Sequence, residues 1–400
     1  MGKKTIGIYM WLISIDSFLM GLHAAIYVIY LRNSGLDFLQ INLVNMAFMV
    51  SVFILEIPTG AIADLFGRKL SFVLSSVVMG IGFVWYGVAN NFIGFIIAEI
   101  IIAVGVVLTS GAFKAWLVDS LHYYNWPGKL SDVFKLEGRF RNSFVLVGGL
   151  LGAYIGSVNL AWPLIGTGIG FFCLAIIAYV LVREDYFKPK KLSEIKLWGD
   201  IKGIALTSVQ YGLKHKVVFM VITAVSVFNL GFPAFNMLWQ PQFSEYLLDT
   251  KYLGYVWVGI VVTSMIGNES INWFRRKFPN QKTGFIVLGG AVGSLMILAA
   301  MSTGLGFLLI GFMGHEIVRG LIRPYMDTII QENIPSKTRA TIDSFVSMMS
   351  KGAMGIGLLV SGYIANEYSK DGAWLYAGLI IILLMPLVMF FNGKKESKNA

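Results

Sequence analysis

Apolar residues run through this chain in twelve long stretches that are separated by short polar segments. Each stretch has about the 20 residues that a helix needs to cross the hydrocarbon core of a bilayer. The pattern therefore predicts an all-α membrane protein with twelve transmembrane helices. We expect these helices near residues 6–31, 41–63, 70–90, 92–118, 139–160, 162–182, 217–240, 252–273, 283–304, 306–331, 340–365 and 372–392.

The longest polar segment, residues 184–216, divides the twelve stretches into two sets of six. It predicts a central cytoplasmic loop that contains an amphipathic helix on the membrane surface. We expect one six-helix bundle over residues 1–183 and a second over residues 217–400. Similar segments precede Glu99 and Glu316 in the two halves. This echo predicts two pseudo-symmetric bundles around a central cavity.

Composition agrees with a membrane protein, because 56% of the residues are hydrophobic and only 14% are charged. A soluble domain of this length is seldom so apolar. The single cysteine, Cys173, excludes a disulfide framework, and we expect it to be a buried apolar residue. The chain has no phosphate-binding loop motif, no nucleophile elbow and no metal-ligand spacing of histidines. We therefore expect a protein that is not an enzyme and that uses no cofactor or metal.

The formal net charge of +10 has a topological explanation. When the loops are assigned to alternate sides, 25 of the 32 Lys and Arg residues fall on one side, together with both termini. The opposite side has only Arg32, Lys251 and Lys370. Because positive residues are retained on the cytoplasmic side, this asymmetry predicts a multi-pass protein of the cell membrane with both termini in the cytoplasm. The partner of the chain is then the lipid bilayer, and no nucleic acid is needed to explain the charge.

Four charged residues lie within the tenth apolar stretch. Glu316, Arg319, Arg323 and Asp327 are spaced by three, four and four residues, so they share one face of a helix. A charge at the centre of a membrane helix costs about 2.5–3.5 kcal/mol on insertion scales, so these residues must be paired, hydrated or functional. One interpretation is a permanent ladder of ion pairs. The other is that Glu316 and Arg319 exchange partners during transport and that Glu316 takes a proton.

Other polar residues inside the apolar stretches are candidates for a proton site or a substrate cavity. Asp16 lies about 15 Å along the first helix, and His23 follows two turns later. Asn229 and Asn236 have the same spacing in the seventh stretch, and Glu99 lies in the fourth. Each acid is a candidate to bind a proton or a cationic substrate, and each is equally a candidate for fixed pairing with a nearby cation.

Aromatic residues of the seventh stretch have two interpretations. Phe228, Phe232, Phe235 and Trp239 can line an apolar cavity for a lipophilic cation. They can equally pack against lipid or neighbouring helices, which is common in a chain with 14% aromatic residues.

The segment between the second and third stretches carries the most specific motif. Gly60, Asp64, Gly67, Arg68 and Lys69 occupy the five fixed positions of the pattern G-x-x-x-D-x-x-G-R-K. In this pattern the glycines permit a tight turn and the basic pair holds the turn in the cytoplasm. The segment resembles the signature of loop 2-3 in the major facilitator superfamily, and all five positions match.

The resemblance implies a charge cluster at a cytoplasmic gate. In the superfamily an acidic residue at the end of helix 4 meets the arginine of the motif, which here implies a cluster of Asp64, Arg68 and Asp119. Glu56 is expected to support this motif. Such a cluster would brace the gate and loosen when the two bundles rock.

The resemblance also implies a secondary active transporter of small molecules that works by alternating access. The chain is most similar to bacterial twelve-helix carriers that export lipophilic, often cationic drugs in exchange for protons, and we expect it to act as a monomer. One alternative is a proton symporter or uniporter of a small polar solute, such as a sugar, a peptide or an organic anion. Another is a flippase for an amphipathic lipid.

Overall fold

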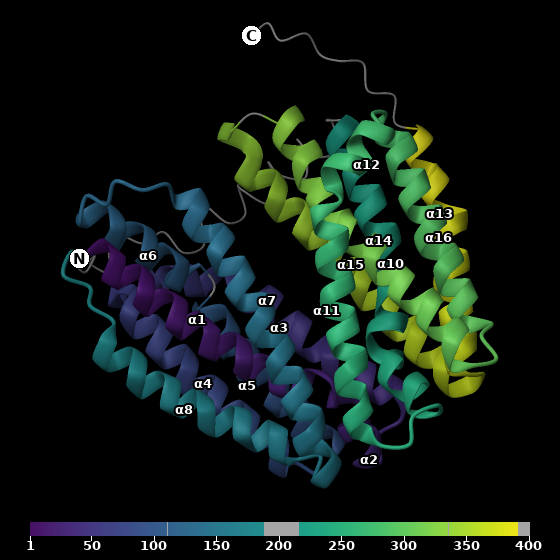
Figure 1. Ribbon diagram of the computed structural model, residues 1–400, viewed down its shortest axis with the longest axis horizontal. Helices are drawn as coiled ribbons and strands as arrows, with labels where there is room; N and C mark the ends of the chain where they lie inside the picture. Colours follow the sequence, from purple (N-terminus) through teal and green to yellow (C-terminus); the bar gives the residue numbers. More distant parts are fainter. Residues whose placement is uncertain (110, 188–215, 335, 391–400) are drawn as a thin grey trace, which may run out of the picture. The chain divides into compact units, whose positions relative to one another are not determined.

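The computed structural model describes residues 1–109, 111–187, 216–334 and 336–390, without the side chains of residues 56–66, 336–341 and 344. In this part of the chain every regular element is a helix and no strand is present (Figure 1). The predicted all-α membrane fold is confirmed. The predicted amphipathic helix in the 184–216 loop lies outside the described residues.

The first half of the chain forms eight described helices. They are α1 (Gly2–Ala24), α2 (Tyr27–Asn33), α3 (Phe38–Phe66), α4 (Arg68–Val88), α5 (Phe92–Thr109), α6 (Ala112–Tyr123), α7 (Leu130–Val158) and α8 (Trp162–Leu181).

The second half contains seven further α-helices and two short 3₁₀ helices. They are α10 (Lys216–Ser244), η2 (Thr250–Tyr252), α11 (Leu253–Glu269), α12 (Ile271–Lys277), α13 (Gln281–Ala300), α14 (Leu305–Asn333), α15 (Ser336–Glu367), α16 (Lys370–Leu384) and η3 (Met385–Phe390).

Each of the twelve predicted stretches corresponds to one helix or to consecutive helices. Ten spans in the described chain are long and apolar enough to cross a membrane. The remaining two stretches correspond to α7, which begins with a charged segment, and to α11, which has only 17 residues. Three predicted stretches are interrupted. The first breaks between α1 and α2, the fourth breaks before α6, where Gly111 has a positive φ of 74°, and the eighth breaks at Ser270 between α11 and α12.

The described chain divides into two compact units. Unit 1 contains the described residues up to 187 together with Gln240–Val261, and unit 2 contains residues 216–239 and 262–390. This division differs from the predicted one only in the segment Gln240–Val261, which packs with the first half. The predicted pair of six-helix bundles remains a prediction.

The segment Gln240–Val261 joins unit 1 through side-chain amide and indole groups. The Gln240 side chain donates from Nε2 to the Ala24 carbonyl at 2.8 Å, and its Oε1 accepts from the Val28 N–H at 2.8 Å. It therefore satisfies backbone groups that the break between α1 and α2 leaves without helical partners. Trp257 adds a bond from Nε1 to the Val145 carbonyl at 3.2 Å.

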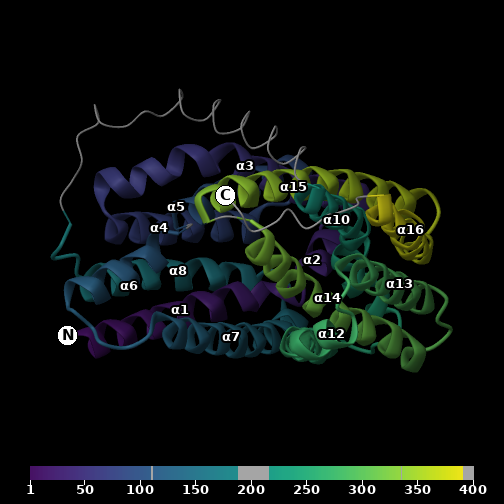
Figure 2. The same cartoon turned by 90° about the horizontal axis from the view of Figure 1, so that it is seen from above.

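Glycines set the closest helix pair of unit 1, in which α1 and α7 lie side by side (Figures 1 and 2). A Cβ atom on Gly148 would overlap the Phe18 carbonyl, and one on Gly152 would overlap the Leu22 carbonyl. The absent side chains therefore allow the two backbones to approach closely, as is common between membrane helices.

In unit 2, α13 packs against both α14 and α16. Trp374 on α16 stacks on Phe235 of α10 with ring centroids 4.2 Å apart, and its Nε1 donates to the Ala234 carbonyl at 3.0 Å. Phe312 of α14 stacks on Phe235 at 5.4 Å. This aromatic core fixes the relative positions of α10, α14 and α16.

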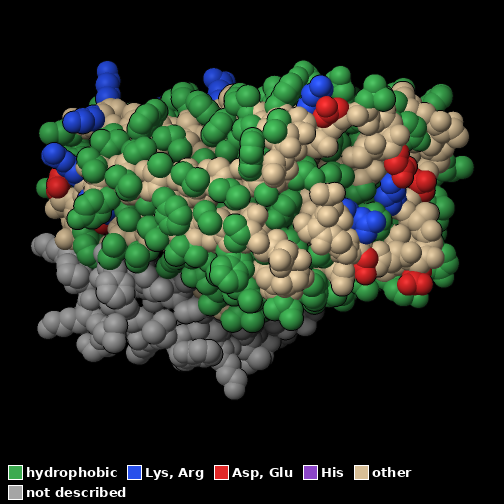
Figure 3. Space-filling model, turned by 90° about the horizontal axis from the view of Figure 1, so that it is seen from below, with side chains coloured by type: hydrophobic (Ala, Val, Ile, Leu, Met, Phe, Trp, Pro, Cys, Tyr) green, Lys and Arg blue, Asp and Glu red, His purple; other side chains and the backbone are tan. Residues whose placement is uncertain are grey.

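Hydrophobic side chains also cover much of the outer surface. The face in Figure 3 is mostly green, with charged side chains in a few clusters. Large apolar residues such as Trp11, Ile93 and Ile176 are exposed, as expected for helices that face lipid. Cys173 on α8 belongs to this exposed surface, so the prediction that it is buried is wrong.

Candidate functional site

The predicted ion pair of the loop motif is present in unit 1. Arg68 Nη1 lies 2.6 Å from Asp119 Oδ2, which joins the start of α4 to α6. Gly67 directly before α4 has a φ of +88°, a conformation that favours glycine. The candidates Glu56, Gly60 and Asp64 lie among the residues whose side chains are not described.

A residue that the sequence reasoning did not single out completes this turn. Glu184 accepts from the backbone N–H groups of Arg68 at 2.8 Å and Lys69 at 3.1 Å, one with each carboxylate oxygen. The carboxylate thus occupies the positive end of α4 and satisfies two of its free N–H groups. The ammonium group of Lys69 lies 4.7 Å from the centroid of the Tyr179 ring.

The segment that carries Glu184 is held against α6 as well. Trp116 donates from Nε1 to the Arg183 carbonyl at 2.8 Å, and the Tyr186 hydroxyl donates to the Trp116 carbonyl at 3.4 Å. Burial raises the pKa of Tyr186, and the negative charge of Glu184 raises it further, so this hydroxyl remains a neutral donor. The residues after α8 therefore connect the end of α8 to the start of α4 and to the middle of α6.

Glu99 lies at the centre of a hydrogen-bonded network in unit 1. The Tyr27 hydroxyl donates to Glu99 Oε1 at 2.7 Å and accepts from the Tyr86 hydroxyl at 2.9 Å and from Asn45 Nδ2 at 3.0 Å. These residues come from α2, α3, α4 and α5. The Glu99 side chain is buried, and the groups that act on it are the two tyrosine hydroxyls.

Asp16 and His23 lie elsewhere on α1. The charged group that acts on Asp16 is Arg141 of α7, whose Nη2 atom also lies 3.2 Å from Glu137 Oε1. Arg141 therefore interacts with two carboxylates. The His23 ring packs on Phe83, with centroids 4.8 Å apart. Arg141 forms its ion pair with Glu137 and acts on Asp16 without pairing with it, so both alternatives for Asp16 remain predictions.

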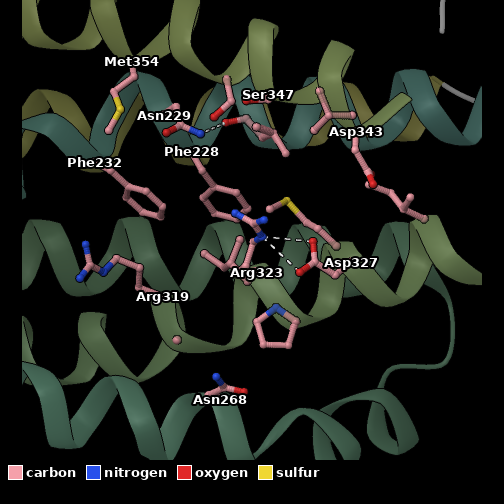
Figure 4. Close-up of a pocket in the computed structure, with 18 of the residues that line it drawn as sticks. Phe228, Asn229, Phe232, Asn268, Arg319, Arg323, Asp327, Asp343, Ser347 and Met354 are labelled. Atoms are coloured by element: carbon pink, nitrogen blue, oxygen red, sulfur yellow. Dashed lines mark hydrogen bonds and ion pairs between the residues drawn. The ribbon is translucent and has the colours of Figure 1, made fainter. Parts of the chain in front are cut away.

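Unit 2 contains a cavity of about 900 Å³ between α10, α11, α14 and α15. Figure 4 shows Phe228 and Phe232 on one wall and Arg319 and Arg323 on the facing wall. Among the lining residues are several polar and charged side chains, namely Asn229, Asn236, Asn268, Arg319, Arg323, Asp327 and Asp343.

The predicted ladder on α14 consists of two ion pairs. Arg319 Nη2 lies 2.8 Å from Glu316 Oε2, and Arg323 Nε lies 3.1 Å from Asp327 Oδ1. Arg319 also donates from Nη1 to Asn236 Oδ1 of α10 at 2.7 Å. In the first pair the Glu316 side chain is almost completely buried. In the second pair the Arg323 side chain is exposed within the cavity. The ladder therefore has one buried end and one solvent-accessible end.

The aromatic residues of α10 have two different environments. Phe228 and Phe232 line the cavity, where their rings stack at 5.5 Å. Phe235 and Trp239 are buried in the core of unit 2. Two of the four residues therefore lie at the cavity, with Phe228 itself almost fully buried, and two lie in the core; that the cavity accepts a lipophilic cation remains a prediction.

The described residues contain no group of three or more His, Cys, Asp and Glu side chains that is arranged to hold a metal ion. What they contain is acidic side chains within the apolar helices, buried at Glu99 and Glu316 and half-buried at Asp16, each with a different set of partners. Hydroxyls surround Glu99, a guanidinium pairs with Glu316, and a guanidinium acts on Asp16. Such groups can bind and release protons or ions inside a membrane.

Comparisons with known proteins agree with this architecture. The family model described as "Major Facilitator Superfamily" matches residues 9–351. The chain is 21% identical over 393 residues to the uncharacterized MFS-type transporter YxaM of Bacillus subtilis (strain 168), covering 95% of this chain and 94% of that protein. It is also 21% identical to the multidrug efflux pump Tap of Mycolicibacterium fortuitum, with coverage of 90% and 88%.

Among solved structures, the nucleoside transporter NupG matches with a TM-score of 0.77 at 13% identity. The match covers 98% of this chain and 100% of that chain, which shows a shared fold. Together with the membrane-spanning helices and the loop motif, these matches indicate a small-molecule transporter within a lipid bilayer. The chain belongs to the Major Facilitator Superfamily and is a transporter, not an enzyme.

Proposed function

We propose that this transporter exports lipophilic, often cationic small molecules in exchange for protons, by alternating access. The observation that carries the proposal is the environment of Glu99. Its carboxyl group is buried, and the partners that act on it are the hydroxyls of Tyr27 and Tyr86. No cation is among these partners.

A buried carboxylate without a counter-ion is costly, so it favours binding either a proton or another cation. If the proton and the substrate compete for the same carboxyl group, each one displaces the other, which is the basis of antiport. Glu316 and Asp16 differ in this respect, because Arg319 pairs with the first and Arg141 acts on the second. Glu99 is therefore the primary candidate for exchange, and the other two acids are secondary candidates.

The surroundings of Glu99 suit a lipophilic cation. The ring centroids of Tyr27 and Tyr86 are 5.8 Å apart. The Phe95 centroid is 5.3 Å from that of Tyr86, and the His23 centroid is 6.4 Å from that of Tyr27. Aromatic faces attract organic cations and bury their apolar groups. The relationship to Tap, a multidrug efflux pump, supports the same substrate class and direction.

A second candidate function is transport of a small polar solute by symport or uniport. It is favoured by the cavity of unit 2, where Arg319, Arg323 and Asn268 offer hydrogen-bond donors. The fold shared with NupG, a nucleoside transporter, supports this candidate. Polar linings of this kind fix the orientation of polar ligands.

Transport by purified protein in liposomes separates the two candidates. With a pH step of about one unit, one-for-one exchange accumulates tetraphenylphosphonium about tenfold. We expect this accumulation with the unsubstituted protein and none with Glu99→Gln. The matched control is Glu269→Gln, which changes an exposed glutamate at the end of α11. Accumulation of uridine instead of tetraphenylphosphonium would support the second candidate and contradict export of cations.

The topology belongs to the same proposal. We place both termini in the cytoplasm, the two six-helix bundles at residues 1–183 and 217–400, and the active form as a monomer. The charge asymmetry of the loops supports the orientation. Fluorescent and periplasmic reporter fusions at either terminus test the orientation, and the mass of the purified protein in nanodiscs tests the oligomeric state.

A further inference from the structure

His315 of α14 is completely buried inside an aromatic box. Its ring centroid lies 4.6 Å from that of Phe235, 5.7 Å from Phe232 and 6.2 Å from Phe312. Trp374 stacks on Phe235 behind it. An apolar ring would fill this space without difficulty, whereas a buried polar group without a partner destabilises the folded protein. The presence of a histidine here therefore needs an explanation beyond packing.

The two ring nitrogens of His315 have different surroundings. Nδ1 lies 3.3 Å from Glu316 Oε1 without forming a hydrogen bond to it, and Nε2 has no hydrogen-bond partner among the described residues. Glu316 is itself 2% exposed and pairs through its other oxygen with Arg319 at 2.8 Å. The imidazole and the guanidinium thus contact the two oxygens of one carboxylate.

Among the described neighbours of His315, the Glu316 carboxylate is the group that can accept a hydrogen bond from the protonated ring. From α10 His315 meets Phe232 and Phe235, and Trp374 of α16 lies behind them. The charged groups that act on it within the described chain are Glu316 and Arg319, both on its own helix. A proton on the imidazole would be disfavoured by burial and by one guanidinium, and stabilised by one carboxylate and by the aromatic faces.

We propose that His315 carries a proton during transport and, when protonated, competes with Arg319 for Glu316. This inference rests on the proposed exchange of substrate for protons. In the neutral state the carboxylate neutralises Arg319, so the three groups have no net charge. After proton uptake, the imidazolium donates from Nδ1 to Glu316 Oε1, and the three groups carry one positive charge.

The added positive charge affects the cavity because Arg319, one of the three groups, lines it. This residue lines the cavity, and its bond to Asn236 Oδ1 at 2.7 Å keeps the guanidinium in the wall when Glu316 is shared. Proton uptake then makes the cavity wall more positive, which weakens the binding of any cation that enters this cavity. His315 is thus a positioning residue for Arg319 as well as a proton carrier.

Nuclear magnetic resonance of histidine ring nitrogens tests the inference without any substrate. The protein has four histidines, and the signal of His315 is the one that disappears in His315→Phe. In nanodiscs, between about pH 4 and pH 9, we expect this signal to change from a neutral to a protonated ring. We also expect Glu316→Gln to shift the pH at which half of the His315 rings are protonated. The matched control is His122, an exposed histidine of α6, whose signal should not respond to Glu316→Gln. The proposal is overturned if the His315 ring stays neutral throughout. It is also overturned if the pH midpoint of its titration is unchanged in Glu316→Gln.

Transport distinguishes this inference from the proposed function. With a pH step of about one unit, the unsubstituted protein should accumulate tetraphenylphosphonium at least tenfold, and His315→Phe, which keeps Glu99, should accumulate markedly less. The unfolding temperature of His315→Phe in detergent shows whether the variant is folded. If the unsubstituted protein does not respond to the gradient, the proposed function fails, and the resonance experiment still decides whether His315 binds a proton. If His315→Phe remains fully coupled, the inference fails alone.

Discussion

The Tyr27 hydroxyl donates to the buried carboxylate of Glu99 over 2.7 Å, and the same hydroxyl accepts two further hydrogen bonds. Tyr27 therefore connects the acid to α3 and α4, because Asn45 and Tyr86 donate to it. A proton that leaves or reaches Glu99 changes the bonding of all four side chains. Loss of this one hydroxyl is expected to disturb proton exchange more than it disturbs folding.

We expect Tyr27→Phe to lower transport driven by a pH gradient by about tenfold or more, because a hydrogen bond to a charged group contributes about 1.5–3 kcal/mol. The measurement is the initial rate of tetraphenylphosphonium uptake into liposomes. Tyr30→Phe is the control, since Tyr30 donates to the backbone carbonyl of Tyr86 and not to a carboxylate. Equal rates in the two variants would contradict the role of Tyr27.

The ion pair between Arg68 and Asp119 is expected to affect transport more than stability. Both side chains are partly exposed, and such pairs contribute about 0–1 kcal/mol. We expect Arg68→Ala and Asp119→Ala each to reduce transport several-fold, with little change in the thermal unfolding temperature. A variant in which Arg68→Asp and Asp119→Arg are combined should regain part of the lost activity. A charge-exchanged protein as inactive as the single variants would show that the ion pair is not the relevant interaction.

Glu184 is expected to stabilise the start of α4. Its two oxygens accept from two N–H groups, and capping interactions of this kind contribute about 0.5–2 kcal/mol. We expect Glu184→Leu to lower the unfolding temperature in detergent, and Glu184→Gln to lower it less. The control is Asp185→Ala, since Asp185 accepts one exposed hydrogen bond from Tyr124. A larger effect of Asp185→Ala would contradict the assignment.

Gly152 is expected to be intolerant of any side chain. The Cβ of Gly152→Ala would overlap the Leu22 carbonyl, so α1 and α7 would have to separate, which typically costs about 1–3 kcal/mol. Gly138 lies on the same helix with no atom near its Cβ direction, so Gly138→Ala should be neutral or stabilising. Unfolding temperatures of the two variants check this contrast. Similar values would show that α1 and α7 are not packed this closely.

Features with a regular or short-range pattern were predictable from the sequence. The apolar stretches correspond to helices because length and hydropathy decide membrane insertion. The two ion pairs of α14 follow from spacing alone, since residues three or four apart share a helix face. The contact between Arg68 and Asp119 was available only through the family resemblance.

Features that depend on distant residues were not predictable. Glu184 is 116 positions from Arg68, and Gln240 is 212 positions from Val28, so no local pattern links them. The break between α1 and α2 has no glycine or proline to mark it. Nor does periodicity separate the cavity residue Phe228 from the core residue Phe235, because apolar residues surround α10 on all sides.

The hydrogen bonds of Gln240 have a consequence for dividing the polypeptide. A cut within residues 184–216 looks natural from the sequence, yet it would remove from the first fragment the amide that completes the junction of α1 and α2. If the chain is instead produced as two fragments divided after Val261, the Gln240 amide stays on the same fragment as the Ala24 carbonyl and the Val28 N–H. The same division would detach residues 216–239 from the rest of unit 2, so neither cut yields two fragments that each contain one complete unit.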